Sequence, residues 1–166
     1  KGVFWKCVKL SDITLPSTIT TIGRYSFQEC TSIEHIEIPD NVTVIDFMAF
    51  YRCESLVAID IPEGVTTITH NSFRKCYSLK NIVLPEGLTK IGERSFEECK
   101  SLKHIDIPNT VTEIKWSVFE DCINLRTINI PPNINTIDIS VFKNCENLES
   151  VILPEGLQTI KEEAFK

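Results

Sequence analysis

The sequence has little glycine and no long apolar or basic run, and each absence excludes a class of protein. Only 6 of its 166 residues are glycine, and none of them forms a glycine-rich loop of the kind that cradles phosphates. No stretch approaches the roughly 20 apolar residues needed to cross a bilayer, so we expect no membrane insertion within this segment. The net charge is −6 and no basic stripe is present, which argues against a nucleic-acid binder.

Cysteine, proline and phenylalanine each recur every 23 residues along the whole chain. A fixed period of 20–50 residues is typical of solenoids, in which each repeat forms one coil of a stack. The unbroken period predicts a single solenoid of about seven coils over residues 1–166. The three columns are Cys7, Cys30, Cys53, Cys76, Cys99, Cys122 and Cys145; Pro16, Pro39, Pro62, Pro85, Pro108, Pro131 and Pro154; and Phe4, Phe27, Phe50, Phe73, Phe96, Phe119, Phe142 and Phe165.

The unit spanning 76–98 shows how one coil is expected to fold. Leu79, Ile82 and Leu84 form the pattern L-x-x-I-x-L, and the last part of this pattern has the alternation of a strand. Pro85 then terminates the strand, because proline cannot donate a hydrogen bond to a ladder. The equivalent positions predict parallel strands at 12–15, 35–38, 58–61, 81–84, 104–107, 127–130 and 150–153.

The second half of each unit predicts a short extended segment and then one or two helical turns. Ile91, Ser95, Phe96 and Cys99 are spaced 4, 1 and 3 apart, as on one face of a helix. A single coil cannot fold alone, because about eight apolar side chains at roughly 2 kcal/mol each do not offset a backbone entropy of about 1–2 kcal/mol per residue. Stability therefore grows only along the stack, and we expect an α/β solenoid with a parallel sheet.

The repeat pattern C-x-x-L-x-x-I-x-[IL]-P-x-x-[VIL]-x-x-I-x-x-x-[SAV]-F-x-x-C resembles the BspA-like leucine-rich-repeat family over essentially the whole chain. The resemblance implies a right-handed leucine-rich-repeat superhelix with a parallel sheet and short helical arcs. It also implies a protein-binding adhesion module, at the cell surface or secreted, that attaches to host matrix proteins or other cells. The family pattern contains no catalytic residues and no cofactor site, so we expect no enzyme activity.

The seven cysteines allow three interpretations. A buried column of small side chains is preferred, because stacked strands about 4.8 Å apart hold equivalent side chains parallel, whereas a disulfide needs converging Cβ atoms. Zinc sites use short pairs such as C-x₂-C, which the sequence lacks. We therefore expect seven reduced, largely buried thiols, with intercoil disulfides and a metal site as the alternatives.

One cluster on the predicted strand surface has residue types found in enzymes. Glu37 and Asp60 occupy the same place in consecutive coils, and His35 lies two residues before Glu37. His104 and Asp106 repeat this pair three coils later. Paired carboxylates are typical of glycosidases, so a carbohydrate-active β-helix-like enzyme is one alternative. Solvated surface charge is preferred, because the acids do not continue and no nucleophile–base pair accompanies them. The equivalent places elsewhere are Thr14, Val83, Asn129 and Ile152.

Two surfaces are candidates for binding a partner. The strand surface is ranked first, because parallel strands make the flattest platform and its exposed residues change from coil to coil. The aromatic residues of the predicted helical arcs are ranked second, since an aromatic side chain can bury about 150–250 Å². The candidates are Glu34, His35, Glu37, Val57, Asp60, Lys80, Asn81 and Val83 on the strands, and Tyr25, Phe47, Tyr51 and Tyr77 on the arcs.

The ends of the sequence show no obvious polar capping unit, although solenoid ends normally need one. The chain also begins at Lys1 without a methionine or a signal-peptide pattern. Both observations predict a piece of a longer repeat protein whose other parts hold export or anchoring signals. We expect a protein or glycoprotein partner and no nucleic acid. A structural spacer and an intracellular scaffold stay open as alternatives.

Overall fold

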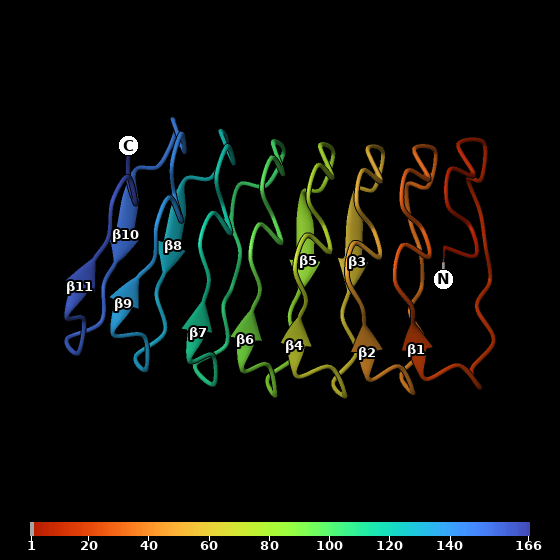
Figure 1. Ribbon diagram of the computed structural model, residues 1–166, viewed down its shortest axis with the longest axis horizontal. Helices are drawn as coiled ribbons and strands as arrows, with labels where there is room; N and C mark the ends of the chain where they lie inside the picture. The colour runs from red at the N-terminus through yellow and green to blue at the C-terminus, as the bar shows by residue number, and fades with distance from the viewer. Residues whose placement is uncertain (1) are drawn as a thin grey trace.

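The computed structural model describes residues 2–166 and shows a stack of coils (Figure 1). Its short parallel strands form five small sheets, which are aligned in two rows that we call the first and the second ladder. Pairing joins equivalent residues of successive coils, such as Ile59 with Ile82 and Ile68 with Ile91, so the period of the sequence is also the register. The first ladder contains β3 (Ala58–Asp60), β5 (Asn81–Val83), β8 (Thr127–Asn129) and β10 (Ser150–Ile152). The second contains β1 (Thr21–Ile22), β2 (Val44–Ile45), β4 (Thr67–Ile68), β6 (Lys90–Ile91), β7 (Glu113–Ile114), β9 (Thr136–Ile137) and β11 (Thr159–Ile160).

The first ladder confirms the predicted parallel strands at β3, β5, β8 and β10, each one residue shorter than expected. The strands expected at 35–38 and 104–107 are reduced to single bridges, and 12–15 holds no strand within the described part of the chain. In β5 the central residue Ile82 is buried between two exposed neighbours, as the alternation of the sequence predicts. The second ladder corresponds to the short extended segments expected after each proline.

The helical arcs predicted from the 4-1-3 spacing are wrong, because residues 2–166 contain no helix, and hence none that could cross a membrane. In the segment 23–31, the amides of Tyr25, Phe27 and Glu29 donate to carbonyls of the next coil. Every second amide is therefore unavailable for the bond to residue i−4 that an α-helix requires. We call these segments the turn arcs: 2–8, 23–31, 46–54, 69–77, 92–100, 115–123 and 138–146.

The turn arcs place non-glycine residues at positive φ on both sides of the framework phenylalanine. Around Phe27 these residues are Tyr25, with φ of 60°, and Glu29, with φ of 61°. A positive φ at the third residue is the geometry of a type II turn, which usually favours glycine. The strain of roughly 1 kcal/mol per such residue is offset by the hydrogen bonds between coils. The arcs therefore depend on their neighbours for their conformation.

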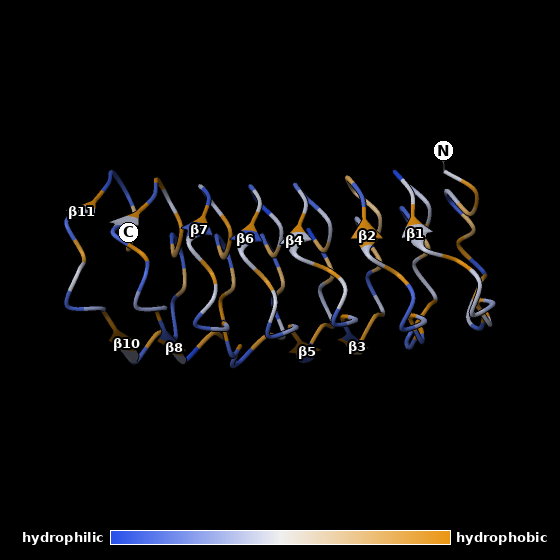
Figure 2. Cartoon of the chain, turned by 90° about the horizontal axis from the view of Figure 1, so that it is seen from below, coloured by the Kyte–Doolittle hydropathy of each residue, from blue (hydrophilic) through white to orange (hydrophobic). Residues whose placement is uncertain are grey.

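The framework phenylalanines form one continuous stack through the core. Successive ring centroids lie 5.2–5.7 Å apart, with interplanar angles of 5–17°. The rings from Phe27 to Phe142 are at most 1% exposed. Figure 2 shows that hydrophobic residues recur at matching places in successive coils. The phenylalanine column is thus the central element of one shared hydrophobic core.

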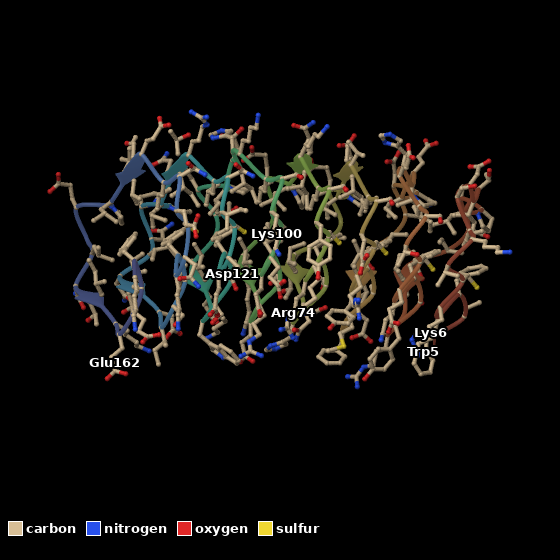
Figure 3. The ribbon with its side chains drawn as sticks, turned by 90° about the horizontal axis from the view of Figure 1, so that it is seen from above. Trp5, Lys6, Arg74, Lys100, Asp121 and Glu162 are labelled. Atoms are coloured by element: carbon tan, nitrogen blue, oxygen red, sulfur yellow. The ribbon has the colours of Figure 1, made fainter. Side chains whose placement is uncertain are left out.

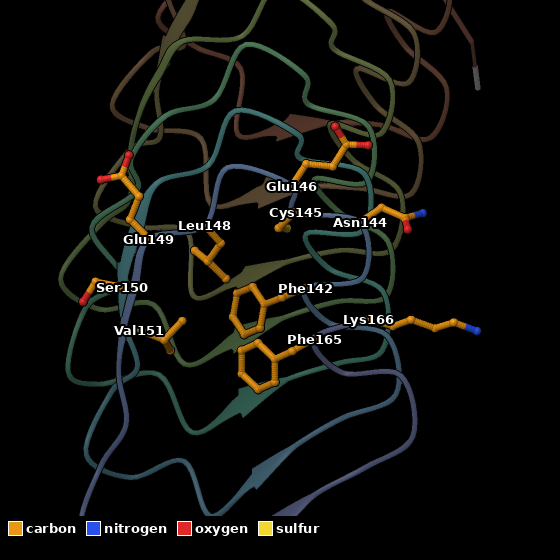
Figure 4. Close-up of a pocket in the computed structure, with 10 residues that line it drawn as sticks. All are labelled: Phe142, Asn144, Cys145, Glu146, Leu148, Glu149, Ser150, Val151, Phe165 and Lys166. Carbon is orange, nitrogen blue, oxygen red and sulfur yellow. The ribbon is translucent and has the colours of Figure 1, made fainter.

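The C-terminal end of the stack is open. Phe165 is 42% exposed there, and a depression of about 480 Å³ lies beside it (Figure 4). Its apolar lining comes from Phe142, Leu148 and Val151, which are core positions in the preceding coils. This depression is the uncovered face of the last coil described, so we do not count it as a candidate site.

Candidate functional site

The first ladder presents its outward side chains along the edge opposite the labelled Trp5 and Arg74 (Figure 3). We call this surface the strand face and define it by the outward side chains of 34–37, 57–60, 80–83, 103–106, 126–129 and 149–152. All eight candidates predicted on the strands lie on it. Seven of them are exposed and Val57 is half-buried. The structure therefore brings these candidates together on one surface.

The carboxylates near the N-terminal half of the strand face form an acidic pole, which consists of Glu34, Glu37 and Asp60. The bridge between His35 and Ala58 aligns the two coils that contain them. Glu37 and Asp60 line an open depression of about 380 Å³ together with His35. The two acids predicted to be neighbours thus share one shallow hollow.

A basic pole, which sequence reasoning did not identify as a site, occupies the next part of the strand face. It consists of Lys80, Lys103 and Arg126, which repeat the same position in three consecutive coils. The 23-residue spacing of these three cations was the signal that could have revealed the pole. Lys80 and Lys103 line an open hollow of about 780 Å³ together with Asn81 and Val83.

The charges of the two poles are mostly unpaired. Among the described residues, the strand face makes only two ion pairs, His104 with Asp106 and Arg126 with Glu149. The second of these pairs is more than half exposed on both sides, where an ion pair contributes about 0–1 kcal/mol. Every acid of the acidic pole, and both lysines of the basic pole, therefore face solvent without a charged partner in this part of the structure.

His104 lies between a carboxylate and a hydroxyl, as in a nucleophilic triad. Its Nε2 is 2.8 Å from Oδ1 of Asp106, and its Nδ1 is 3.2 Å from Oγ1 of Thr127. The Asp106 side chain is 94% exposed, so water screens the charge that would activate the hydroxyl. The arrangement orients the imidazole on the strand face and supports a polar contact surface better than it supports catalysis.

The aromatic candidates lie on the turn arcs, where most of them contact neighbouring side chains. Tyr25 and Phe47 meet edge to face, with ring centroids 5.5 Å apart. The Arg74 guanidinium lies 5.9 Å from the Tyr51 ring, and the Lys100 ammonium lies 5.1 Å from the Tyr77 ring. All four aromatic candidates are half-buried. They fill the spaces between neighbouring arcs, although part of each ring stays accessible.

Charged residues of the turn arcs pair with one another across coils. Glu97 is the most buried example, with only 8% of its side chain exposed between Arg74 at 2.8 Å and Arg94 at 3.3 Å. Burial raises the pKa of the Glu97 carboxyl, although both guanidinium groups oppose the shift. Across coils, Arg24 also pairs with Asp46 and Lys75 with Glu98, whereas Arg52 pairs with Glu54 inside one arc. Asp138 and Lys143 of the last arc pair with Lys161 and Glu163 of the coil that follows it.

All seven cysteines are free, and six of them are buried as predicted. Cys7 is exposed, which corrects the expectation for that residue. Each buried thiol donates a hydrogen bond of 3.0–3.2 Å to the carbonyl of the framework phenylalanine one coil earlier. Burial raises the pKa of Cys30 to about 11 and that of Cys145 to about 12. The described residues contain no group of three or more His, Cys, Asp or Glu side chains that could hold a metal ion.

These repeats match a known family. A family model described as BspA type leucine rich repeat region matches the chain in six copies, over residues 1–126 and 66–166. The chain belongs to this family. A search of curated proteins found no match. The family and the solved structures together establish a leucine-rich-repeat β-solenoid with parallel strands.

Three solved leucine-rich-repeat structures illustrate the relationship. A leucine-rich-repeat protein of T. pallidum is 34% identical, with a TM-score of 0.84 over 88% of this chain and 71% of its own. One from Bacteroides ovatus is 36% identical, with a TM-score of 0.85 over 89% of this chain and 38% of its own. A leucine-rich cell surface protein of Faecalibacterium prausnitzii is 27% identical, with a TM-score of 0.56 over 98% of this chain and 65% of its own.

Proposed function

We propose that this BspA-type chain is a protein-binding module, displayed at the cell surface or secreted, that attaches to host matrix proteins or to other cells through its strand face. The observation that supports this most directly is the unpaired charge on the strand face. Desolvating a charge without a partner costs free energy, whereas meeting an opposite charge on a partner gives specificity and speeds association. A surface that keeps its charges free is thus suited to a charged partner.

A surface location is supported by the relatives, since one similar structure is that of a leucine-rich cell surface protein. The leucine-rich-repeat fold itself supports protein binding, because the stacked strands form an extended surface. A structural spacer would present the same fold, but that role requires no charges that are free to meet a partner. An intracellular scaffold would bind partners through the same surface and differs from this proposal in its location.

The turn arcs are a second candidate surface. Trp5 is 53% exposed, and Tyr25, Phe47 and Tyr51 remain partly accessible. Aromatic residues often dominate the binding energy of an interface, so this surface would bind by apolar contact. We rank it second because its rings already pack against one another and against arginine or lysine side chains.

Two double variants separate the surfaces. Purified chain is tested for binding to immobilised matrix proteins and to cells, as the parent, as Glu37→Ala with Asp60→Ala, and as Phe47→Ala with Tyr51→Ala. We expect the acidic pair of substitutions to weaken binding at least about tenfold, equivalent to about 1.4 kcal/mol. If only the aromatic pair abolishes binding while both variants stay folded, the strand face is the wrong surface. If the parent binds no protein at all, the proposed function fails.

A further inference from the structure

Among the described residues, the unpaired charges of the strand face are separated by sign along the solenoid, because Asp106 and Glu149 on the same surface pair with His104 and Arg126. The acidic pole, Glu34, Glu37 and Asp60, precedes the basic pole, Lys80, Lys103 and Arg126. Glu37 and Lys103 are three coils apart, which the ring stack converts to about 16 Å. Glu37 and Lys103 therefore lie farther apart than the Debye length of about 8 Å at physiological ionic strength, whereas Asp60 and Lys80 occupy adjacent coils. The strand face therefore has a defined order of unpaired charge along the solenoid axis, with negative charge toward the N-terminus and positive charge after it.

The basic pole coincides with a break in the first ladder. β3 pairs with β5 and β8 pairs with β10, but no hydrogen bond in the described residues joins 80–84 to 103–107. The second ladder is continuous at this level, because β6 pairs with β7. The stack is thus held together behind the break while its front opens into a hollow of about 780 Å³, which the His104–Asp106 pair lines together with Lys80 and Lys103. Val83, 58% exposed, gives this hollow an apolar patch.

The chemistry of the face favours a polypeptide over an anionic polysaccharide. A sulfated glycan has charges of one sign, so a chain long enough to follow the face would meet Glu37 and Asp60 after leaving the lysines. A polypeptide can place acidic and basic side chains in sequence. The aromatic rings on which sugars commonly stack lie on the turn arcs and not on the strand face. The exposed Val83 also suits an aliphatic side chain of a peptide.

We propose that the strand face binds an extended segment of a partner protein, with acidic residues of that segment over the basic pole and basic residues over the acidic pole. This inference rests on the proposed function and adds the charge order and orientation of the partner. The partner segment runs along the solenoid axis and crosses successive coils. Its basic end lies toward residues 34–37 and its acidic end lies over Lys103 and Arg126.

Synthetic peptides test the charge order without knowledge of the natural partner. The first probe has an acidic block and a basic block joined by a short neutral spacer, and the second has the same composition with alternating charges. Fluorescence anisotropy at low and at physiological salt measures both. We expect the block peptide to bind at least about tenfold more tightly than the alternating one, with a difference that shrinks as salt screens the poles.

Charge-reversed proteins then test each pole. Lys80→Glu with Lys103→Glu, and Glu37→Lys with Asp60→Lys, should each weaken binding of the block peptide at least about tenfold. Lys6→Glu with Lys100→Glu is the matched control, because it changes the net charge as much as the first variant but lies away from the strand face (Figure 3). The control should bind the block peptide within about twofold of the parent.

Orientation is measured with a label on Cys7, the one exposed cysteine in the described chain. Energy transfer should be stronger from a donor on the basic end of the peptide than from one on its acidic end. The variant with all four reversals should still bind, with this order exchanged. Equal affinity for the block and alternating peptides, or an unchanged order in the fourfold variant, would overturn the proposal.

Two other occupants give distinct results. A sulfated glycan that binds more tightly than the block peptide, and that is lost with Lys80→Glu and Lys103→Glu, would replace the peptide proposal. Self-association in sedimentation that either reversal abolishes would make a second copy the occupant. If matrix proteins bind through the strand face but the order of charges makes no difference, this inference fails while the proposed function stands. Absence of all protein binding defeats both.

Discussion

The strand face and the turn arcs both present charged side chains, but mainly those of the turn arcs neutralise one another. Arg74 and Arg94 enclose Glu97, and Lys75 meets Glu98 on the next coil. On the strand face, Lys80 and Lys103 have no charged partner within the described residues. The charges of the turn arcs therefore contribute mainly to the fold, whereas those of the strand face are left for another molecule.

The aromatic residues follow the same division. Rings on the turn arcs contact guanidinium or ammonium groups, as Trp116 contacts Arg94 at 4.4 Å. Such cation–π contacts stabilise the packing of neighbouring arcs. The strand face has no phenylalanine, tyrosine or tryptophan and is built from charged, polar or aliphatic side chains. Substitutions on the two surfaces should therefore have different effects on stability.

The core beneath both surfaces should be the most sensitive. Phe96 is fully buried and stacks on Phe73 and Phe119 at 5.6 and 5.7 Å. We expect Phe96→Ala to lower the free energy of unfolding by about 3–5 kcal/mol, because it removes a large ring and leaves a cavity. Urea unfolding followed by circular dichroism measures the change. A loss below about 1 kcal/mol would show that the stack is not the stabilising element.

The turn arcs should depend on their ion pairs. Arg74→Met keeps an apolar stem but leaves the buried Glu97 carboxylate with only Arg94. We expect this change to lower the free energy of unfolding by about 2 kcal/mol at neutral pH. The matched control is Lys103→Met on the strand face, which breaks no ion pair. Equal losses in the two variants, measured by urea unfolding, would contradict the division between the surfaces.

The Arg74→Met loss should also depend on pH. Burial raises the pKa of Glu97 above its ordinary value of 4.5, and Arg74 opposes that shift. Removing Arg74 raises the pKa further. An acid with a raised pKa in the folded state loses stability as pH rises through that pKa, because the folded state must release a proton that it holds more tightly than the unfolded chain. The deficit relative to the parent should therefore grow from pH 4 to pH 7. A deficit that is the same at both pH values would mean that Glu97 is not involved.

The thiol column should have an intermediate effect. Cys76 is fully buried and donates to the Phe50 carbonyl at 3.2 Å. We expect Cys76→Ala to cost about 1–2 kcal/mol in urea unfolding, because it removes a packed sulfur atom and a weak donor. Thiol titration of the parent provides an independent check, since only Cys7 should react rapidly before denaturation. Rapid reaction of several thiols in native protein would contradict the buried column.

The strand face should tolerate substitution best. Lys103→Met and Asp60→Asn each remove one exposed charge that has no charged partner in the described structure. We expect each to change the free energy of unfolding by less than about 0.5 kcal/mol. Losses above about 1 kcal/mol in urea unfolding would show that these charges stabilise the fold and are not free for a partner.

Much of the fold could be predicted from the sequence, because the packing of one coil is repeated in the next. The alternation around Ile82 and the stop at Pro85 locate β5, and the period transfers that assignment to β3, β8 and β10. The turn arcs could not be distinguished from helices, because an overlapping turn and a helix bury residues at similar spacings. The turn arcs differ from a helix in that the amides of Tyr25, Phe27 and Glu29 donate to carbonyls of the next coil. The pattern of side chains in the sequence does not show which carbonyl an amide donates to.

The candidate site was predicted in part. Exposure of Glu37, Asp60 and Lys80 follows from strand alternation, which depends only on the local chain. Whether a charge is paired depends on rotamers and on residues 20 or more positions away, as for Arg74 and Glu97. The break in the ladder between 80–84 and 103–107 is likewise a property of two coils together. Neither feature is visible in a single repeat.

Because the phenylalanine rings are evenly spaced, the number of coils between two sites determines the distance between them. Each coil advances the phenylalanine stack by 5.2–5.7 Å, and every surface position recurs once per coil. Inserting one further 23-residue unit between Asp60 and Lys80 would move the acidic and basic poles apart by one ring spacing and leave the residues of both intact. The number of repeats would then determine how far apart the acidic and basic blocks of a ligand must be, in steps of little more than 5 Å. The residues that recognise those blocks would stay the same.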